Sequence, residues 1–126
     1  KSGRTYDPSS KEKEDFLKLL DIPLNKMEKP IKCTLFFYSL RPKNHYRSGK
    51  YSALLKPTSP KYNTSRKDID NMVKFVLDAL NNKLYVDDAQ VVELYCKKEF
   101  SDNKDKGNIY MKFEEIDYVP ETSNNT

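Results

Sequence analysis

The stretch PIKCTLFFYSLRP, from Pro30 to Pro42, places the strongest constraint on the fold. Apolar side chains alternate through Cys33, Leu35 and Phe37, and further apolar rings occupy Phe36 and Tyr38 in between. Alternation with a period of two is typical of a β-strand. Because both sides of this strand are apolar, we predict a central strand that is covered on both faces.

Helices are predicted on either side of this strand. Residues 8–23, PSSKEKEDFLKLLDIP, begin with a capping box at Ser9 and Glu12 and end at Pro23. A second helix begins at Asp68, follows an apolar period of 3.6, and ends at Asn81 and Asn82.

Two further strands follow the second helix. We predict one over residues 91–100 and a returning strand around Ile109, Met111 and Phe113, joined by the loop SDNKDKGN. The order predicts an α+β fold with a small mixed β-sheet and two main helices. The length of 126 residues fits a single domain, which we place at residues 1–118, with a polar tail at 119–126.

Positive charge is concentrated between Arg41 and Lys67. This basic segment has no Asp or Glu, whereas the rest of the chain has a net charge of −4. Such asymmetry favours a polyanionic partner over a merely solvated surface, and Tyr46, Tyr51 and Tyr62 between the cations could stack on unpaired bases. The predicted DNA-binding residues here are Arg41, Lys43, Arg47, Lys50, Lys56, Lys61, Arg66 and Lys67.

Acidic side chains follow directly after the basic segment. Asp68 and Asp70 open the second helix, and Asp87 and Asp88 lie where the chain enters the next strand. For the first pair the structural interpretation is strong, because Asp68 suits a helix cap and Asp70 complements the helix dipole. The second pair favours a functional role for the acids, since a strand packed on the helix would bring the carboxylates of Asp87 and Asp88 back toward the first pair.

Three carboxylates from two elements suit a divalent metal site for phosphoryl transfer. Mg²⁺ prefers oxygen ligands and takes few protein carboxylates, because water and substrate phosphate complete its coordination. Lys74, one turn after Asp70, is placed to reach a phosphate oxygen, and its structural alternative is an ion pair with Asp70. We assign Asp78 a structural role, as a possible partner of Lys74, because it is too distant from Asp68.

The run from Asp68 to Leu94, DIDNMVKFVLDALNNKLYVDDAQVVEL, resembles the RusA-type Holliday-junction resolvases. The resemblance combines Asp-x-Asp-Asn, a Lys four residues later, Asp-Ala-Leu, and Asp-Asp-x-Gln-Val. It implies a RusA-like fold and a homodimeric, Mg²⁺-dependent endonuclease, with Mn²⁺ as a substitute, that cuts branched DNA at four-way junctions. The catalytic residues it implies are Asp68, Asp70, Asp88 and Lys74; Asp87 is a less certain metal ligand, and Lys98 is a DNA contact.

The chain also departs from the family plan. The family usually begins with a strand that carries Pro, Lys and Arg before the first helix, and we expect this strand to be absent here, because the sequence shows nothing of the kind ahead of Lys1. Two other classes remain as alternatives. One is a non-catalytic junction-binding module whose acids cap a helix; the other is a nucleotide-sugar transferase, which would need a larger chain with a nucleotide pocket.

The cysteines and the hydropathy pattern indicate the kind of cellular compartment in which the protein works. Cys33 and Cys96 lie in apolar runs without metal-ligand spacing, which predicts two buried thiols in a reducing compartment inside the cell. No apolar run is long enough for a transmembrane helix, so we expect no membrane association.

Overall fold

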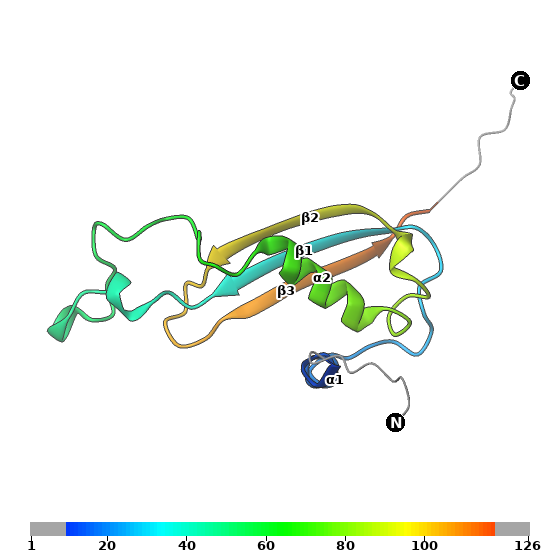
Figure 1. Cartoon of the computed structure of the whole chain (residues 1–126), viewed down its shortest axis with the longest axis horizontal. Coiled ribbons are helices and arrows are strands. Elements are labelled where there is room, and N and C mark those ends of the chain that lie inside the picture. The colour runs from blue at the N-terminus through cyan, green and yellow to red at the C-terminus, as the bar shows by residue number, and fades with distance from the viewer. Residues whose placement is uncertain (1–9, 118–126) are drawn as a thin grey trace, which may run out of the picture.

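The computed structural model describes residues 10–117 and shows a sheet with helices packed on it (Figure 1). In chain order, its helices and strands are α1 (Ser10–Lys18), β1 (Ile31–Ser39), α2 (Ile69–Leu80), β2 (Val91–Phe100) and β3 (Asn108–Glu115). Three short 3₁₀ turns lie between them, at Lys43–His45, Gly49–Tyr51 and Asp88–Gln90. The predicted polar tail lies outside the described residues.

The three strands form one mixed sheet in the order β2-β1-β3. β1 pairs in parallel with β2 and antiparallel with β3, which confirms the predicted central position of this strand. The pairing aligns Leu35 with Cys96 on one side and Met111 on the other, so these three side chains share a face. The predicted α+β class is therefore confirmed.

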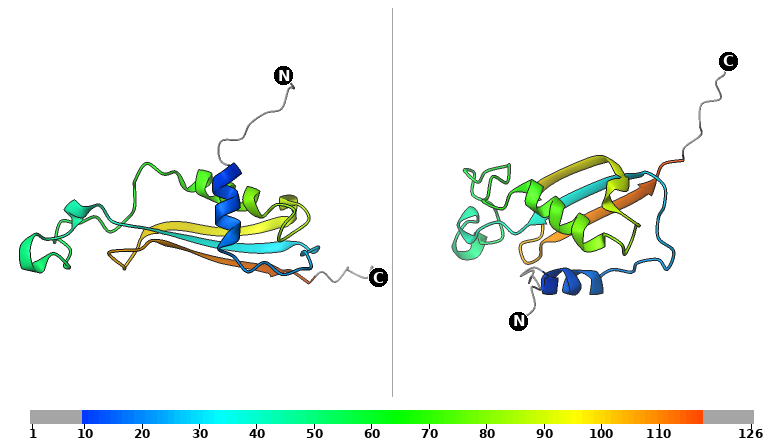
Figure 2. Two further views of the ribbon diagram at one scale, coloured as in Figure 1. Left: turned by 90° about the horizontal axis from the view of Figure 1, so that it is seen from below. Right: turned by 45° about the vertical axis from the view of Figure 1, so that its right-hand side comes forward.

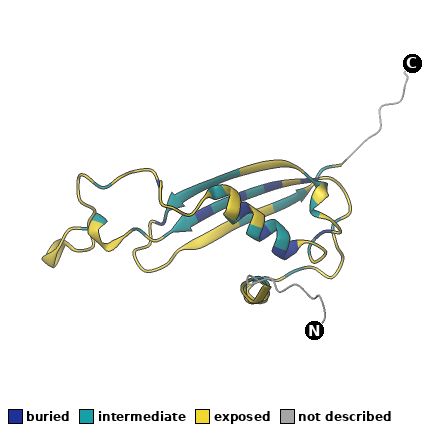
Figure 3. Cartoon of the chain, in the orientation of Figure 1, coloured by how far each residue is buried: buried dark blue, intermediate teal, exposed yellow. Residues whose placement is uncertain are grey.

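The core lies between β1 and α2, where the buried residues concentrate (Figure 3). Ile31, Cys33 and Leu35 are completely buried, and Val76 of α2 is buried against them. Tyr85 is also fully buried, and its hydroxyl donates a hydrogen bond of 2.7 Å to the carbonyl oxygen of Leu77. This bond removes the cost of burying an unpaired hydroxyl group.

Only one face of the sheet is covered by helices. Both α1 and α2 lie on the side of Cys33 and Leu35, and the opposite face carries neither helix (Figure 2). The predicted covering of both faces is therefore wrong for the described residues. Phe36 and Tyr38 lie half-buried on this open face, among side chains of the two neighbouring strands.

The helix bounds follow local chemistry. α2 ends at Leu80 as predicted, and the next turn places Asn82 at a φ of 60°, a conformation that asparagine tolerates better than most residues. α1 ends at Lys18, so the predicted end at Pro23 is wrong: the amides of Leu19 and Leu20 bond to carbonyls three residues back and close the last turn tightly. Its predicted cap at Ser9 lies outside the described residues.

Within residues 10–117, no helix combines the length and the apolar composition that crossing a membrane requires.

Candidate active site

A groove of about 400 Å³ runs between α2 and the start of β2. Asp70, Lys74 and Asp78 line it from one face of α2, because they are spaced four residues apart. Asp88 contributes the fourth polar side chain from the 3₁₀ turn before β2. The remaining lining is apolar and comprises Ile69, Val73, Leu77, Leu94 and Cys96. Acids from two segments therefore line one groove beside α2, and it is Asp78 rather than Asp70 that lies close enough to influence Asp88.

Asp68 stands at the N-cap of α2 without capping it. Its carbonyl oxygen accepts the first helical bond, 3.2 Å from the Met72 amide, but its side chain accepts no cap hydrogen bond. The side chain is exposed, and it does not line the groove. The structural role that competed with metal binding for this carboxylate is therefore not realised, and its oxygens are available to a ligand.

The neighbouring acids Asp87 and Asp88 have different tasks. Asp87 caps the following turn: its carboxylate accepts a bond of 3.0 Å from the Ala89 amide, and its own amide donates to Gln90 Oε1 at 2.9 Å. The carboxylate of Asp88 instead faces the groove, and its amide is held by Asn81 Oδ1 at 3.0 Å. This division favours Asp88 over Asp87 as the functional acid of the pair.

The surroundings of Asp88 disfavour its negative charge. Partial burial is the main cause that raises the pKa of Asp88, followed by a hydrogen bond with the Asp87 side chain and the negative charges of Asp87 and Asp78. A carboxylate in such surroundings gains when a cation arrives, because the cation offsets both the burial and the repulsion.

Lys74 lies between Asp70 and Asp78 in the groove. In the described part of the chain it forms no ion pair with either acid, so its ammonium is not committed to the helix surface. Sequence reasoning placed Asp78 outside the site, whereas the structure places it in the groove and close enough to influence Asp88. The signal that could have found it is the spacing of 70, 74 and 78 along one helix face.

Among the described residues, no three acidic, histidine or cysteine side chains stand close enough together to hold an ion as a ready-made cluster. The rise of an α-helix separates Asp70 from Asp78 by about 12 Å along the axis. The acids are thus spread along the groove, and the predicted set of Asp68, Asp70 and Asp88 is not gathered at one point. Their oxygen donors suit a hard cation such as Mg²⁺ or Mn²⁺, which retains water and substrate ligands.

Two side chains anchor the segment that leads into α2. Lys98 of β2 donates from Nζ to the carbonyl oxygens of Ser65 and Lys67, at 2.8 and 2.7 Å. Asn63 is buried; it donates to the Glu99 carbonyl at 3.3 Å and accepts from the Ser65 amide at 3.1 Å. Lys98, predicted as a DNA contact, here ties the approach to Asp68 to the end of β2. We call Asn63 and Lys98 the tether.

The basic segment extends beyond one end of the sheet as an arm (Figure 1). Not all of its cations are free for a ligand. The guanidinium of Arg41 donates to the Pro60 carbonyl at 2.7 Å and lies over the ring of Phe100, and Arg47 donates to the Leu55 carbonyl at 3.1 Å. These two arginines stabilise the arm. The other predicted contacts there, Lys43, Lys50, Lys56, Lys61, Arg66 and Lys67, are exposed.

A second groove, of about 560 Å³, lies within the arm and is lined by Lys43, Arg47 and Lys56. Lys104 joins them from the loop between β2 and β3, where its Nζ donates to the Ser52 carbonyl at 2.8 Å. The sequence did not point to Lys104, because the loop that carries it also contains acids and the contact spans 52 residues. The arm therefore presents three cations around this groove, and the β2–β3 loop adds a fourth.

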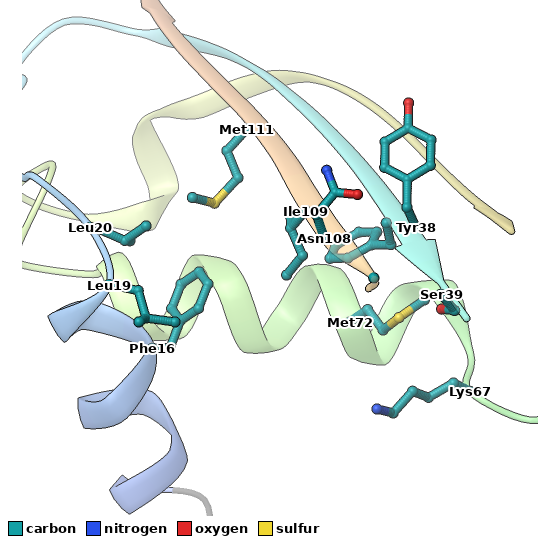
Figure 4. A pocket seen from close by; sticks show the side chains of 12 residues that line it. Phe16, Leu19, Leu20, Tyr38, Ser39, Lys67, Met72, Asn108, Ile109 and Met111 are labelled. Carbon is teal, nitrogen blue, oxygen red and sulfur yellow. The ribbon is translucent and has the colours of Figure 1, made fainter. Parts of the chain in front are cut away.

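A third groove, between α1, α2 and β3, has a different character (Figure 4). It measures about 530 Å³, and its lining includes Phe16, Met72 and Met111 with Lys67 as its one charged side chain. Because it holds no carboxylate, it offers neither a metal ligand nor a general base.

Comparisons with known proteins show the family to which the chain belongs. The chain matches the family described as "Endodeoxyribonuclease RusA" over residues 3–111. It is 37% identical over 78 residues to a protein of Bacillus subtilis (strain 168) named "Uncharacterized protein YqaN", which corresponds to 58% of this chain and 51% of that relative. The chain therefore spans about half the length of the curated relative. No solved structure matches it. With most of its length matched to one family model, the chain belongs to the RusA endodeoxyribonuclease family.

Proposed function

We propose that this protein is a structure-specific endodeoxyribonuclease that resolves four-way DNA junctions by metal-dependent hydrolysis of phosphodiester bonds. The observation that carries the proposal is the carboxylate groove, which Asp70 and Lys74 line from α2 and Asp88 lines from the turn before β2, with the basic arm leading into the start of α2. Family membership supports the same reaction class.

In this proposal, the carboxylates act as ligands. Asp70 and Asp88, which line the groove, and Asp68, with its uncommitted oxygens at the helix start, would supply the ligands of divalent cations, with water and DNA phosphate as the remaining ligands. The bound cation would lower the pKa of attacking water and neutralise charge on the phosphate. Asp87 is the weaker candidate, because its carboxylate already accepts the Ala89 amide.

Lys74 and the arm act on the DNA. Lys74 is uncommitted to any ion pair in the described residues, so its ammonium can stabilise the charge that develops on the scissile phosphate. The exposed lysines of the arm hold neighbouring phosphates, which fixes the position of the strand without reading its sequence.

The proposed enzyme works as a homodimer, because two related sites match the two strands cut in a symmetric junction. We also propose that it works in a reducing compartment inside the cell. Both cysteines are free, and burial raises the pKa of the Cys33 thiol to about 12, which leaves that thiol unreactive.

The test is a cleavage assay on a four-way junction, a fork and a linear duplex, with Mg²⁺, with Mn²⁺ or with EDTA. We expect paired nicks in the junction with either metal and none with EDTA. Asp70→Asn should lower the cleavage rate about 100-fold or more while junction binding persists, because a metal ligand is lost and a repulsive charge is removed. Asp105→Asn, in the exposed β2–β3 loop, is the matched control and should cut normally.

The competing function is a junction-binding module without catalysis. It predicts tight junction binding and no cleavage with any metal, in the wild type and in Asp70→Asn alike. It also requires the acids to serve as caps, which Asp87 does and Asp68 does not. Cleavage that persists in EDTA, or in Asp70→Asn at the normal rate, would exclude the proposed mechanism.

A further inference from the structure

The turn that carries Asp88 is short and is held only weakly by its own backbone. It spans Asp88–Gln90, and its bonds run from the Gln90 amide to the Asp87 carbonyl, at 3.0 Å, and from the Val91 amide to the Asp88 carbonyl. Short 3₁₀ segments of this kind have poor hydrogen-bond geometry. The other acids that line the carboxylate groove lie on α2, a helix of 12 residues. The position of Asp88 therefore depends on what the turn contacts.

The side chain of Gln90 anchors this turn to a distant segment. Its Oε1 accepts a hydrogen bond of 2.9 Å from the Asp87 amide, and its Nε2 donates to the carbonyl oxygens of Met27 and Lys29, both at 3.0 Å. Both hydrogens of the side-chain amide are therefore used. The capping box of the turn accounts for the first bond alone. The other two bonds reach 63 and 61 residues back along the chain, so a local cap does not explain them.

The segment that receives these bonds, in the linker between α1 and β1, is itself fixed. Glu115, the last residue of β3, accepts hydrogen bonds from the amides of Glu28 and Lys29 at 3.0 and 3.2 Å. The Met27 amide donates to the Leu84 carbonyl at 2.9 Å. Figure 1 shows the linker passing the turn at the end of the sheet where β1 and β2 begin. The turn is therefore anchored to a part of the chain that the sheet holds in place.

A second side-chain amide holds the turn from the side of α2. Asn81 is the first residue after this helix, and its Oδ1 accepts a bond from the Asp88 amide at 3.0 Å. Asn81 and Gln90 thus connect the turn to α2 and to the linker, and we call these two residues the clamp. None of the clamp's bonds uses the carboxylate of Asp88. Because both side chains are neutral, they form no ion pair that a metal cation would have to displace.

We propose that Asn81 and Gln90 are positioning residues that set the affinity of the carboxylate groove for a divalent cation. The inference rests on the proposed function and deepens it. No three acids among the described residues stand close enough to hold an ion unaided, and Mg²⁺ takes its oxygen ligands at about 2.0–2.1 Å. Cation binding must therefore draw Asp88 and the acids of α2 together. The clamp lowers the conformational cost of that step, because it holds the turn beside the helix.

A purely structural role for the clamp is the competing interpretation. Both interpretations predict that Gln90→Met, which removes the hydrogen bonds and keeps a long side chain, lowers the unfolding temperature. They differ in the dependence on metal. A structural role leaves the folded variant with the metal affinity of the wild type, whereas positioning predicts an affinity lower by about 10- to 100-fold. Saturating Mg²⁺ should then restore cleavage by Gln90→Met, but not by Asp70→Asn, which has lost a ligand.

Two measurements on the full chain test the proposal at constant ionic strength. One is the rise in unfolding temperature that Mg²⁺ causes without DNA, and the other is the Mg²⁺ concentration that gives half-maximal junction cleavage. We expect Gln90→Met to need at least about tenfold more Mg²⁺ in both, with an unchanged KM for the junction at saturating metal. Asn81→Ala should act in the same direction. Lys83→Met, at an exposed residue of the same connection, is the matched control and should behave like the wild type.

The outcomes separate the clamp from the proposed chemistry. If the folded Gln90→Met and Asn81→Ala variants keep the Mg²⁺ dependence of a wild type that cuts, the clamp fails and the nuclease stands. If Mg²⁺ stabilises the wild type but no junction is cut, and Gln90→Met needs more Mg²⁺ for the same stabilisation, the clamp stands and the proposed nuclease fails. A wild type that neither cuts nor responds to Mg²⁺ overturns both.

Discussion

At the scale of single residues, Asp88 couples the stability of the fold to pH. Its pKa is raised above the ordinary value of 3.8, mainly by partial burial, so the ionised side chain destabilises the folded state. That cost is fully present above the folded-state pKa and vanishes below the ordinary value. A metal bound at Asp88 would remove the same cost.

We therefore predict that Asp88→Asn raises the free energy of unfolding at neutral pH in EDTA. The difference from the wild type should disappear at about pH 3, where the wild-type Asp88 is neutral like the asparagine that replaces it. Urea denaturation at a series of pH values measures this, with Asp105→Asn as control. Added Mg²⁺ should stabilise the wild type and leave Asp88→Asn unchanged; equal stabilisation of both would argue against Asp88 as a ligand.

Gly107 is a second residue with a specific constraint. A Cβ atom at this position would lie 2.6 Å from the carbonyl oxygen of Tyr38, a backbone atom that cannot move freely. Gly107→Ala should therefore destabilise the protein by about 1–3 kcal/mol. Thermal unfolding compared with Lys106→Ala, an exposed neighbour, checks this; equal midpoints would show that the β1–β3 pairing adjusts at no cost.

At the scale of elements, the tether joins β2 to the start of α2. Two charge-assisted bonds from Lys98 fix the carbonyls of Ser65 and Lys67, directly before Asp68. Because Lys98 pairs with Phe37 and shares the covered face of the sheet, its ammonium reaches this segment without leaving the core side. The geometry predicts that the tether determines where the first acid lies.

Lys98→Met should thus lower the cleavage rate constant about tenfold while the KM for the junction changes little. If Lys98 instead contacts DNA directly, Lys98→Met should bind the junction more weakly and with a smaller dependence on salt, while the cleavage rate constant changes little. Single-turnover cleavage and binding titrations separate the two. Asn63→Ala should reproduce the effect of Lys98→Met, and Lys98→Arg should restore part of the rate.

The elements also show which features the sequence could predict. The central position of β1, the end of α2 at Leu80 and the bounds of β2 followed from local periodicity and turn residues. The open face could not be predicted in this way, because the apolar rings of Phe36 and Tyr38 indicate a buried face when their own strand is considered alone. Lys98 bonds to a segment more than 30 residues earlier in the chain, and Asp78 lines the groove because α2 packs beside the turn before β2. No local sequence pattern records such contacts.

At the scale of the whole molecule, charge is divided between the arm and the remainder. The arm carries exposed lysines and no acid, whereas the carboxylates of the candidate site lie along α2 and the turn before β2. DNA held by the arm can therefore approach the carboxylate groove with its charge neutralised before it meets the acids.

Replacing Lys43 and Lys56 together by Gln should weaken junction binding and reduce the slope of log affinity against log salt by about 2, since each phosphate contact contributes about 0.9. Titrations at several salt concentrations measure the slope. Lys11→Gln with Lys18→Gln on α1 is the matched control. An unchanged slope in the arm variant would show that these lysines do not meet phosphates.

The arm leaves the sheet after Ser39 and returns at Asp68 beside the same end, and the tether holds its returning base. Changes of length between these two fixed points need not disturb the core, since doubling the length of a flexible loop costs only about 0.6 kcal/mol. Lineages could thus lengthen, shorten or exchange the arm and acquire a preference for different branched substrates while the acids keep their geometry. The same modularity makes residues 41–62 a natural cassette for engineering.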